Sequence, residues 1–236
     1  MNVNACIFDL DGTLIDSAKD IASSVNYLRG ELGMSFLPLE TIENYVGDGL
    51  ANLLMRSLET QDVEVLERAT ALYRPYYETH CLDQTKVYPG ILDMLKQLVV
   101  KKLPMAIVSN KPEKYCRKII DGLSLGSFFN VIVGSDTTSR CKPDPLPFKH
   151  ACRVLQCEPA HTLVIGDGIN DVLGARNIGA FSCGVLWGIG DRNVLRNAKP
   201  DYLIQKPDEL IRLIELSAEE SLGRAGEKAP RVKSQR

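Results

Sequence analysis

The chain has 236 residues, 44% of them hydrophobic, and a formal net charge of −2. That charge argues against a nucleic-acid-binding protein, which usually carries a basic excess, and no apolar run reaches the ~20 residues of a membrane span. The seven cysteines are scattered and odd in number, which favours reduced thiols over disulfides or a zinc site. The first residues carry no basic side chain and the apolar run after them is short, so we expect no signal peptide and a cytoplasmic location.

The first apolar run, Ala5–Phe8, is predicted to be a strand that is buried on both faces of a sheet. Asp9 and Asp11 follow it directly, with Gly12 and Thr13 behind them. Carboxylates at the end of a buried strand are costly unless they bind something. A hard cation, which prefers oxygen ligands, is the usual occupant of such a place. We therefore expect a cation at this strand end.

The following stretch, 17–85, contains helical patterns and no convincing strand. Apolar residues recur at helical spacing over 21–32, 50–58 and 63–76, and a short helix is expected over 38–45. This block of helices separates the first strand from all later strands. It therefore reads as an insertion that forms a small second domain.

The rest of the chain alternates apolar runs with helical patterns, after a Pro-Gly turn at 89–90. Strands are predicted at 103–108, 131–133, 163–165, 181–185 and 201–204, with helices at 91–98, from 112, at 147–155, 170–178 and 207–216. Strands that alternate with helices predict a parallel sheet with helices on both faces.

The predicted fold class is therefore α/β, a Rossmann-like parallel sheet flanked by helices, with a small inserted helical cap domain. We expect residues 1–16 and 86–216 to form the core domain and residues 17–85 the cap. The segment 217–236 is charged and poor in apolar residues. We expect it to be a disordered or only partly helical tail.

Polar residues also follow two of the later strands. Ser109 and Asn110 come after the second strand, and Asp167 and Asp171 come after the fourth. Lys142 lies in the loop between them. In parallel α/β sheets, ligands bind at the carboxyl ends of the strands. We therefore place all these side chains in one site with the acids of the first strand.

In this order, the motifs resemble those of the haloacid-dehalogenase-like phosphohydrolases, over roughly residues 4–216. The residues that carry the resemblance are Asp9-Leu-Asp11-Gly-Thr13, Ser109-Asn110, Lys142 and Asp167-x-x-x-Asp171. The resemblance implies a Mg²⁺-dependent enzyme that cleaves a small phosphorylated molecule through an aspartyl-phosphate intermediate. It implies no nucleic-acid or membrane partner.

The resemblance also implies a role for each residue. Asp9 is the nucleophile, and Asp11 is the general acid that protonates the leaving oxygen and then the base that activates water. The implied metal ligands are Asp9, Asp11 (through its backbone carbonyl), Asp167 and Asp171, the last of which either orients a metal-bound water or binds Lys142.

Other residues are implied to bind the phosphate. Ser109 and the amide of Asn110 would bind phosphate oxygens, and Lys142 would pair with Asp9 and with the phosphoryl group during transfer. Gly12 and Thr13 would shape a turn whose backbone N–H groups reach the phosphate.

Within the family, an acid at Asp11 implies a phosphatase or a phosphomutase rather than a dehalogenase. The cap turn Gly47-Asp48-Gly49, followed by Arg56, looks like the substrate loop of phosphoglycolate phosphatases, and so does Ser109-Asn110-Lys111. A helix N-terminus at Gly49 would favour an anion, and Lys111 or Arg56 would pair with a carboxylate. This branch implies hydrolysis of 2-phosphoglycolate to glycolate and phosphate.

Other readings stay open at this point. Relatives that cleave pyrophosphate, nucleoside monophosphates or sugar phosphates have the same motifs, and so do β-phosphoglucomutase-like mutases. A regulatory module without catalysis is a further class, against which the intact catalytic set argues. The sequence also leaves open whether the protein is a monomer or a homodimer.

Some polar residues fit no motif. Asp144 is expected to cap a turn or a helix. His80, His150 and His161 are expected to be ordinary surface or core residues, and Trp187 a packing residue. Cap movement is expected to occur about two linkers, 14–16 and 86–90.

Overall fold

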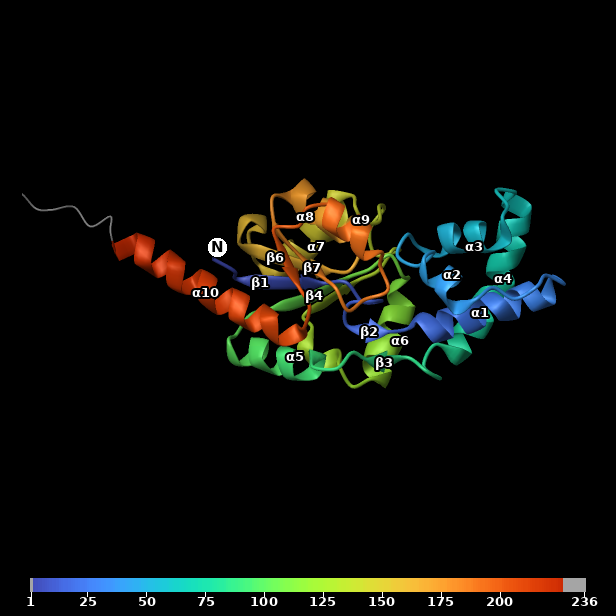
Figure 1. The fold of residues 1–236 in the computed structure, drawn as a ribbon, viewed down its shortest axis with the longest axis horizontal. Coiled ribbons are helices and arrows are strands. Elements are labelled where there is room, and N and C mark those ends of the chain that lie inside the picture. The colour runs from blue at the N-terminus through green and yellow to red at the C-terminus, as the bar shows by residue number, and fades with distance from the viewer. Residues whose placement is uncertain (1, 227–236) are drawn as a thin grey trace, which may run out of the picture.

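The computed structural model describes residues 2–226. A sheet of six parallel strands forms its centre, in the order β5-β4-β1-β6-β7-β8 (Figure 1). The strands are β1 (Ala5–Phe8), β4 (Met105–Val108), β5 (Val131–Val133), β6 (Thr162–Gly166), β7 (Phe181–Val185) and β8 (Tyr202–Ile204). The parallel sheet with flanking helices confirms the predicted α/β fold class.

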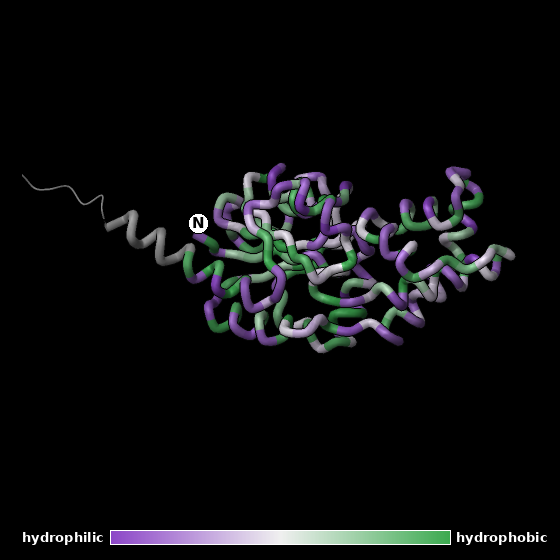
Figure 2. Tube along the Cα trace, viewed as in Figure 1, coloured by the Kyte–Doolittle hydropathy of each residue, from purple (hydrophilic) through white to green (hydrophobic). Residues whose placement is uncertain are grey.

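Helices cover both faces of this sheet. They are α5 (Ile91–Val100), α6 (Glu113–Gly122), α7 (Pro145–Leu155), α8 (Ile169–Ile178), α9 (Arg192–Asn197) and α10 (Pro207–Gly226), with short 3₁₀ helices at Gly126–Phe128 and Pro159–His161. Side chains of β1 alternate between two buried clusters, because successive strand residues point to opposite faces. Ile7 packs with Phe148 of α7, while Phe8 lies in the cluster that contains residues of α5, α6 and α10. Figure 2 shows hydrophobic residues concentrated along the central strands.

The remaining helices, α1 (Ala18–Glu31), α2 (Leu39–Glu43), α3 (Leu50–Leu58) and α4 (Val63–His80), lie together beyond one end of the sheet (Figure 1). We call this group the insert. No strand interrupts it among the described residues, as the sequence predicts.

An antiparallel ribbon of two short strands joins the insert to the sheet domain. It pairs β2 (Ile15–Asp16) with β3 (Lys86–Val87). Next to it, the buried carboxylate of Asp20 accepts hydrogen bonds from the backbone N–H groups of Gln84 and Thr85, at 2.8–3.0 Å. The chain therefore enters and leaves the insert at neighbouring points. The sequence did not predict this ribbon, because two residues are too few to show a strand period.

Three predicted boundaries need correction. Pro112 precedes α6 as its cap rather than starting the helix, and α7 begins at Pro145 rather than at residue 147. Asp144 caps α7, as predicted, by accepting a hydrogen bond from the Leu146 N–H at 2.8 Å. Residues 217–226, expected to be disordered or partly helical, continue α10, since alanine, glutamate, leucine and arginine favour helices. The rest of the predicted tail, 227–236, lies outside the described residues.

All seven cysteines are free thiols, as expected from their scatter. In the part of the chain that the structure describes, no helix is both long and apolar enough to cross a membrane.

The close packing of α8 against α7 yields a stability prediction. A Cβ atom on Gly174 would lie 2.1 Å from the ring of Phe148, which is fully buried. We expect Gly174→Ala to lower the free energy of unfolding by about 1–3 kcal/mol, because a packed core cannot move aside. Denaturant unfolding measures the change.

Gly30→Ala in α1 is the matched control, since its Cβ would meet the Phe36 ring at an ordinary 3.4 Å. It should leave stability unchanged or raise it by up to about 1 kcal/mol. Equal losses at both positions, or none at Gly174, would contradict the described packing.

Candidate active site

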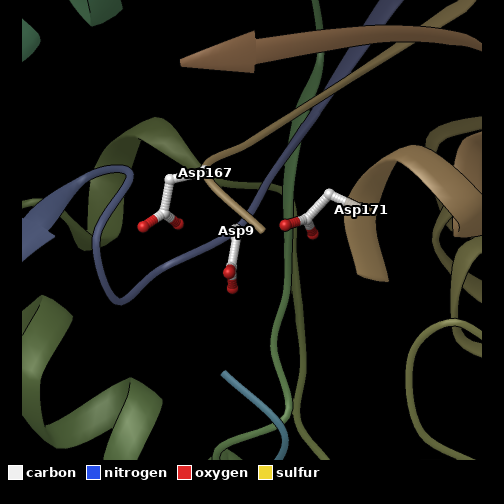
Figure 3. Close-up of side chains that lie close together, drawn as sticks. All are labelled: Asp9, Asp167 and Asp171. Carbon is white, nitrogen blue, oxygen red and sulfur yellow. The ribbon is translucent and has the colours of Figure 1, made fainter. Parts of the chain in front are cut away.

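Three carboxylates meet at the carboxyl ends of the central strands. Asp9 follows β1, Asp167 follows β6, and Asp171 lies in the first turn of α8. One oxygen from each lies within 4.8 Å of the others, and all three side chains are buried. Figure 3 shows the three groups around a common space. The sequence prediction that these strand ends share one site is confirmed for these residues by the geometry.

Lys142 lies among these acids. Its ammonium is 2.7 Å from Oδ1 of Asp9 and 2.8 Å from Oδ1 of Asp171. Burial lowers the pKa of Lys142, but Asp171 and Asp9 outweigh that effect and the net pKa lies above its usual value. The lysine therefore stays charged. The side chain of Asn110 fixes the backbone of Lys142, because its Oδ1 accepts a hydrogen bond from the Lys142 N–H at 2.9 Å.

Burial, and after it the excess of carboxylates over the one ammonium, raises the pKa values of these acids. Burial, partly offset by Lys142, raises the pKa of Asp9 from 3.8 to about 7. Burial and the charge of Asp9 raise the pKa of Asp167 to about 6, and burial also raises that of Asp171. A site of buried oxygen ligands with excess negative charge fits a hard divalent cation such as Mg²⁺.

The turn after β1 holds Asp167 in place. The hydroxyl of Thr13 donates to Oδ1 of Asp167 and accepts from its N–H, both at 3.1 Å. Gly12 has φ +81°, and a Cβ there would lie 2.1 Å from Oδ2 of Asp167, so only glycine fits. The N–H groups of Gly12 and Thr13 donate to the carbonyls of Ile15 and Leu10. These two amides thus bond within the turn, and a contact of other N–H groups of the turn with the phosphate stays a prediction.

A second turn holds the same carboxylate, and the sequence analysis missed it. The N–H groups of Ile189 and Gly190, after β7, donate to Oδ2 of Asp167 at 2.9 and 2.8 Å. A Cβ on Gly188 would lie 2.3 Å from the carbonyl oxygen of Gly12. The two glycines of Gly188-Ile189-Gly190, directly after an apolar strand, were the sequence feature that could have predicted this turn. Trp187 donates to the Thr13 carbonyl at 3.0 Å and is half-buried, which confirms its packing role.

Asp11 lies apart from the three-carboxylate cluster. The ammonium of Lys111 is 2.6 Å from its Oδ1, and the hydroxyl of Ser17 donates to the same oxygen at 2.5 Å. Its side chain is thus paired and lies outside the described metal-ligand group. A ligand role for its backbone carbonyl stays a prediction.

The insert turn Gly47-Asp48-Gly49 reaches the sheet domain. The side chain of Asn110 donates to the Gly47 carbonyl at 2.9 Å, and that of Asn170 donates to Oδ1 of Asp48 at 2.8 Å. Arg56 binds the other oxygen of Asp48 at 2.6 Å. This turn therefore contacts neighbours of Ser109 and Asp171, the two residues predicted to bind phosphate and metal.

A cavity lies between the insert and the sheet domain. Its lining is Asp9, Asp11, Ser109, Asn110, Lys111, Pro112 and Tyr115 from the sheet domain, and Ile21, Val46, Gly47, Gly49, Leu50, Leu53, Tyr73 and Tyr77 from the insert. Lys111 is the one cationic side chain among the described residues that line it. Arg56 lies outside the lining and is paired with Asp48, so the prediction that it meets a substrate carboxylate is not supported.

None of the three histidines lies in this lining, as expected. His80, for example, pairs with Asp83 at 2.7 Å on the surface of the insert.

Comparisons with known proteins agree with these motifs. The family model described as haloacid dehalogenase-like hydrolase matches residues 6–185. A phosphoglycolate phosphatase of Neisseria meningitidis is 36% identical over 89% of this chain and 92% of its own length. One of Chromobacterium violaceum is 37% identical over 82% of this chain and 90% of its own. The solved structure of a haloacid dehalogenase-like family hydrolase from Streptococcus pneumoniae has a TM-score of 0.81 at 28% identity, covering 89% of this chain and 98% of its own.

The raised pKa values predict how a divalent cation affects stability. A carboxyl whose folded pKa lies above its unfolded value stabilises the fold fully below about pH 3.8, and this contribution is lost as the pH rises through about 6 to 7. The cation binds only the carboxylates, so it should stabilise most above that window. With Mg²⁺ at about one hundred times its Kd, the gain is about 2.7 kcal/mol, or roughly 5–10 °C in Tm.

Thermal unfolding with and without Mg²⁺ at about pH 5 and about pH 8 tests this linkage. We expect a clear Tm increase at the higher pH and almost none at the lower. Asp167→Asn should abolish the increase, while Asp62→Asn, at the exposed N-terminal cap of α4, should keep it. An equal Mg²⁺ effect at both pH values would rule out competition between protons and metal at these carboxylates.

Proposed function

The chain belongs to the haloacid dehalogenase-like hydrolases, and on that premise we propose that it is a Mg²⁺-dependent phosphatase of small phosphomonoesters, with 2-phosphoglycolate as its substrate. The observation that carries the proposal is the buried group of Asp9, Lys142, Asp167 and Asp171, in which Asp9 lines the same cavity as Asp11.

Asp9 is the proposed nucleophile. Its Oδ1 accepts from the ammonium of Lys142 and from the Leu10 N–H, both at 2.7 Å. With Oδ1 held by two donors, Oδ2 is the oxygen that attacks phosphorus and forms the aspartyl-phosphate. Such a covalent intermediate divides one difficult displacement into two easier ones.

The phosphoryl group is bound by residues around Asp9. The hydroxyl of Ser109 and the Asn110 backbone border the cavity, and the ammonium of Lys142 lies beside the attacking carboxylate. A fixed positive charge here acts most strongly on the transition state, in which charge spreads over the phosphoryl oxygens. Mg²⁺, held by Asp9, Asp167, Asp171 and the Asp11 carbonyl, would neutralise phosphate charge when bound.

Asp11 completes the reaction. As general acid it gives a proton to the leaving oxygen, and as general base it then takes a proton from the water that hydrolyses the aspartyl-phosphate. Water must be excluded during the first step and admitted in the second. We propose that the insert, residues 17–85, acts as the cap that controls this access by moving about the β2–β3 ribbon.

The choice of 2-phosphoglycolate is supported by the relatives that are named phosphoglycolate phosphatases. The insert side of the cavity is mostly apolar, with Ile21, Leu50 and Leu53. Ile21, Leu50 and Leu53 offer no hydrogen bonds to the hydroxyls of a sugar, and among the insert residues of the lining only Tyr73 and Tyr77 carry side-chain hydroxyls. This favours hydrolysis of a small ester over the mutase reaction of a hexose phosphate.

Phosphate release from a panel of phosphomonoesters and pyrophosphate, with and without Mg²⁺, tests this function. We expect Mg²⁺-dependent release that is selective for 2-phosphoglycolate. Asp9→Asn should lower kcat by at least about 10⁴-fold, because it removes the attacking carboxylate. Asp62→Asn makes the same change from acid to amide at the exposed cap of α4 and should keep full activity. Activity that survives in Asp9→Asn would exclude Asp9 as the nucleophile. Selectivity for another ester would overturn the assignment of 2-phosphoglycolate as substrate and leave the proposed mechanism unchanged.

The contact between Asp48 and Asn170 gives a separate prediction about cap closure. Asn170→Ala should lower kcat/KM by about fivefold to tenfold, because it removes a hydrogen bond to a charged group worth about 1–1.5 kcal/mol. Asp48→Ala should do the same, and the double variant should be no worse than the poorer single variant. Asn44→Ala, whose side chain donates only within α2, is the control. Additive losses would show that the two residues act separately.

A further inference from the structure

The carboxyl group of Asp11 is oriented by two donors on a single oxygen. Lys111 and Ser17 both reach Oδ1, at 2.6 and 2.5 Å. Two hydrogen bonds to one oxygen fix the rotation of the carboxyl group about its Cβ–Cγ bond. This leaves Oδ2 as the oxygen that can carry a proton to a leaving group.

Lys111 is itself held from the side of the insert. Its ammonium donates to the hydroxyl of Tyr77 at 2.7 Å and lies 5.1 Å from the centre of the same ring. Only 8% of the Lys111 side chain is exposed. Burial lowers the pKa of Lys111, but the Asp11 carboxylate outweighs that effect and keeps it above its usual value. Because so little of this charged lysine meets water, its ammonium depends on Asp11 and Tyr77 as hydrogen-bond partners.

The position of Tyr77 depends on how the insert docks on the sheet domain. Tyr77 lies in α4, where its ring stacks on Tyr73 with centroids 5.4 Å apart. It also meets the ring of Tyr115, in α6, edge-on at 5.4 Å. On the surface beside them, Lys114 of α6 pairs with Glu78 of α4 at 2.8 Å. The Tyr77 hydroxyl therefore reaches Lys111 when α4 is docked on α6.

We propose that Tyr77 and Lys111 are positioning residues that orient Asp11 for proton transfer only while the insert is docked. The proposal rests on the proposed function, since it requires Asp11 to protonate the leaving oxygen. In that step the Asp9–phosphorus bond forms, the phosphorus–oxygen bond of the ester breaks, and the proton on Oδ2 of Asp11 passes to the leaving oxygen. Asp11 becomes a carboxylate, and the ammonium of Lys111 stabilises the new charge.

Esters differ in how much they need this proton. An alkyl ester releases an alkoxide, a strong base that must be protonated as it departs. A p-nitrophenyl ester releases a stable phenolate that departs as an anion. A misplaced Asp11 therefore slows cleavage of the alkyl ester selectively, whereas a defect in phosphate binding or folding slows both.

Tyr77→Phe tests this, because it removes the hydroxyl and keeps the ring between Tyr73 and Tyr115. The readout is kcat/KM with Mg²⁺ for an alkyl phosphate and for p-nitrophenyl phosphate, since kcat/KM includes only the steps up to release of the leaving group. We expect about a tenfold loss for the alkyl ester, a fraction of the 10²–10⁴-fold effect of a general acid, and less than about a twofold loss for the aryl ester.

Tyr76→Phe is the matched control, since Tyr76 is the adjacent residue of α4, stacks on Tyr27 and lies outside the cavity lining. Tyr76→Phe should change kcat/KM for neither ester. Lys111→Met, which keeps the length and removes the charge, should show the same selectivity as Tyr77→Phe with a larger loss. Equal losses for both esters in Tyr77→Phe, or no loss for the alkyl ester, would overturn the positioning role. Failure of the proposed function gives a different result, in which the wild type releases no Mg²⁺-dependent phosphate or Asp9→Asn stays active.

Discussion

The structure depends on one buried electrostatic arrangement, in which the ammonium of Lys142 lies between the carboxylates of Asp9 and Asp171. Removing one partner from such a group leaves an uncompensated charge out of water, which typically destabilises a protein by about 3–5 kcal/mol. Here the lysine offsets only part of the negative charge, because Asp167 is also buried beside it. A divalent cation would neutralise the remaining negative charge and the charge of an incoming phosphoryl group. The same imbalance therefore makes the free site unfavourable and the loaded site favourable.

Much of the surrounding chain keeps these groups in place against their repulsion. Thr13, Ile189 and Gly190 supply hydrogen bonds to Asp167, and Asn110 fixes the backbone of Lys142. Glycines occupy the places where turns approach the carboxylate too closely for a side chain, as Gly12 and Gly188 do. These supports follow three different strands, β1, β4 and β7. The parallel sheet is thus what allows residues distant in the sequence to hold one another at fixed distances.

The sequence was sufficient to predict the features that follow from topology. Alternating strands and helices indicated the parallel sheet, and the rule for strand ends brought Asp9, Lys142 and Asp167 together correctly. The sequence was insufficient where tertiary contacts decide which carboxylate a charged side chain pairs with. Lys111 and Arg56 both had the charge for a substrate carboxylate, yet they pair with Asp11 and Asp48, and no local pattern reveals those pairs. The β2–β3 ribbon was too short to be seen, and the final helix exceeded its prediction because charged residues with high helix propensity resemble a disordered segment.

The ribbon has a consequence for how such a protein can change during evolution. Because β2 pairs with β3, and Asp20 binds the backbone at Gln84 and Thr85, the two ends of the insert lie side by side. The sheet domain then constrains only the distance between these two ends. Each doubling of the length of a closed loop adds only about 0.6 kcal/mol to the entropic cost of closing it. Helices in the insert can be lost, gained or exchanged while the phosphoryl-transfer residues stay unchanged. Substrate preference and reaction chemistry can therefore diversify at separate rates within one polypeptide.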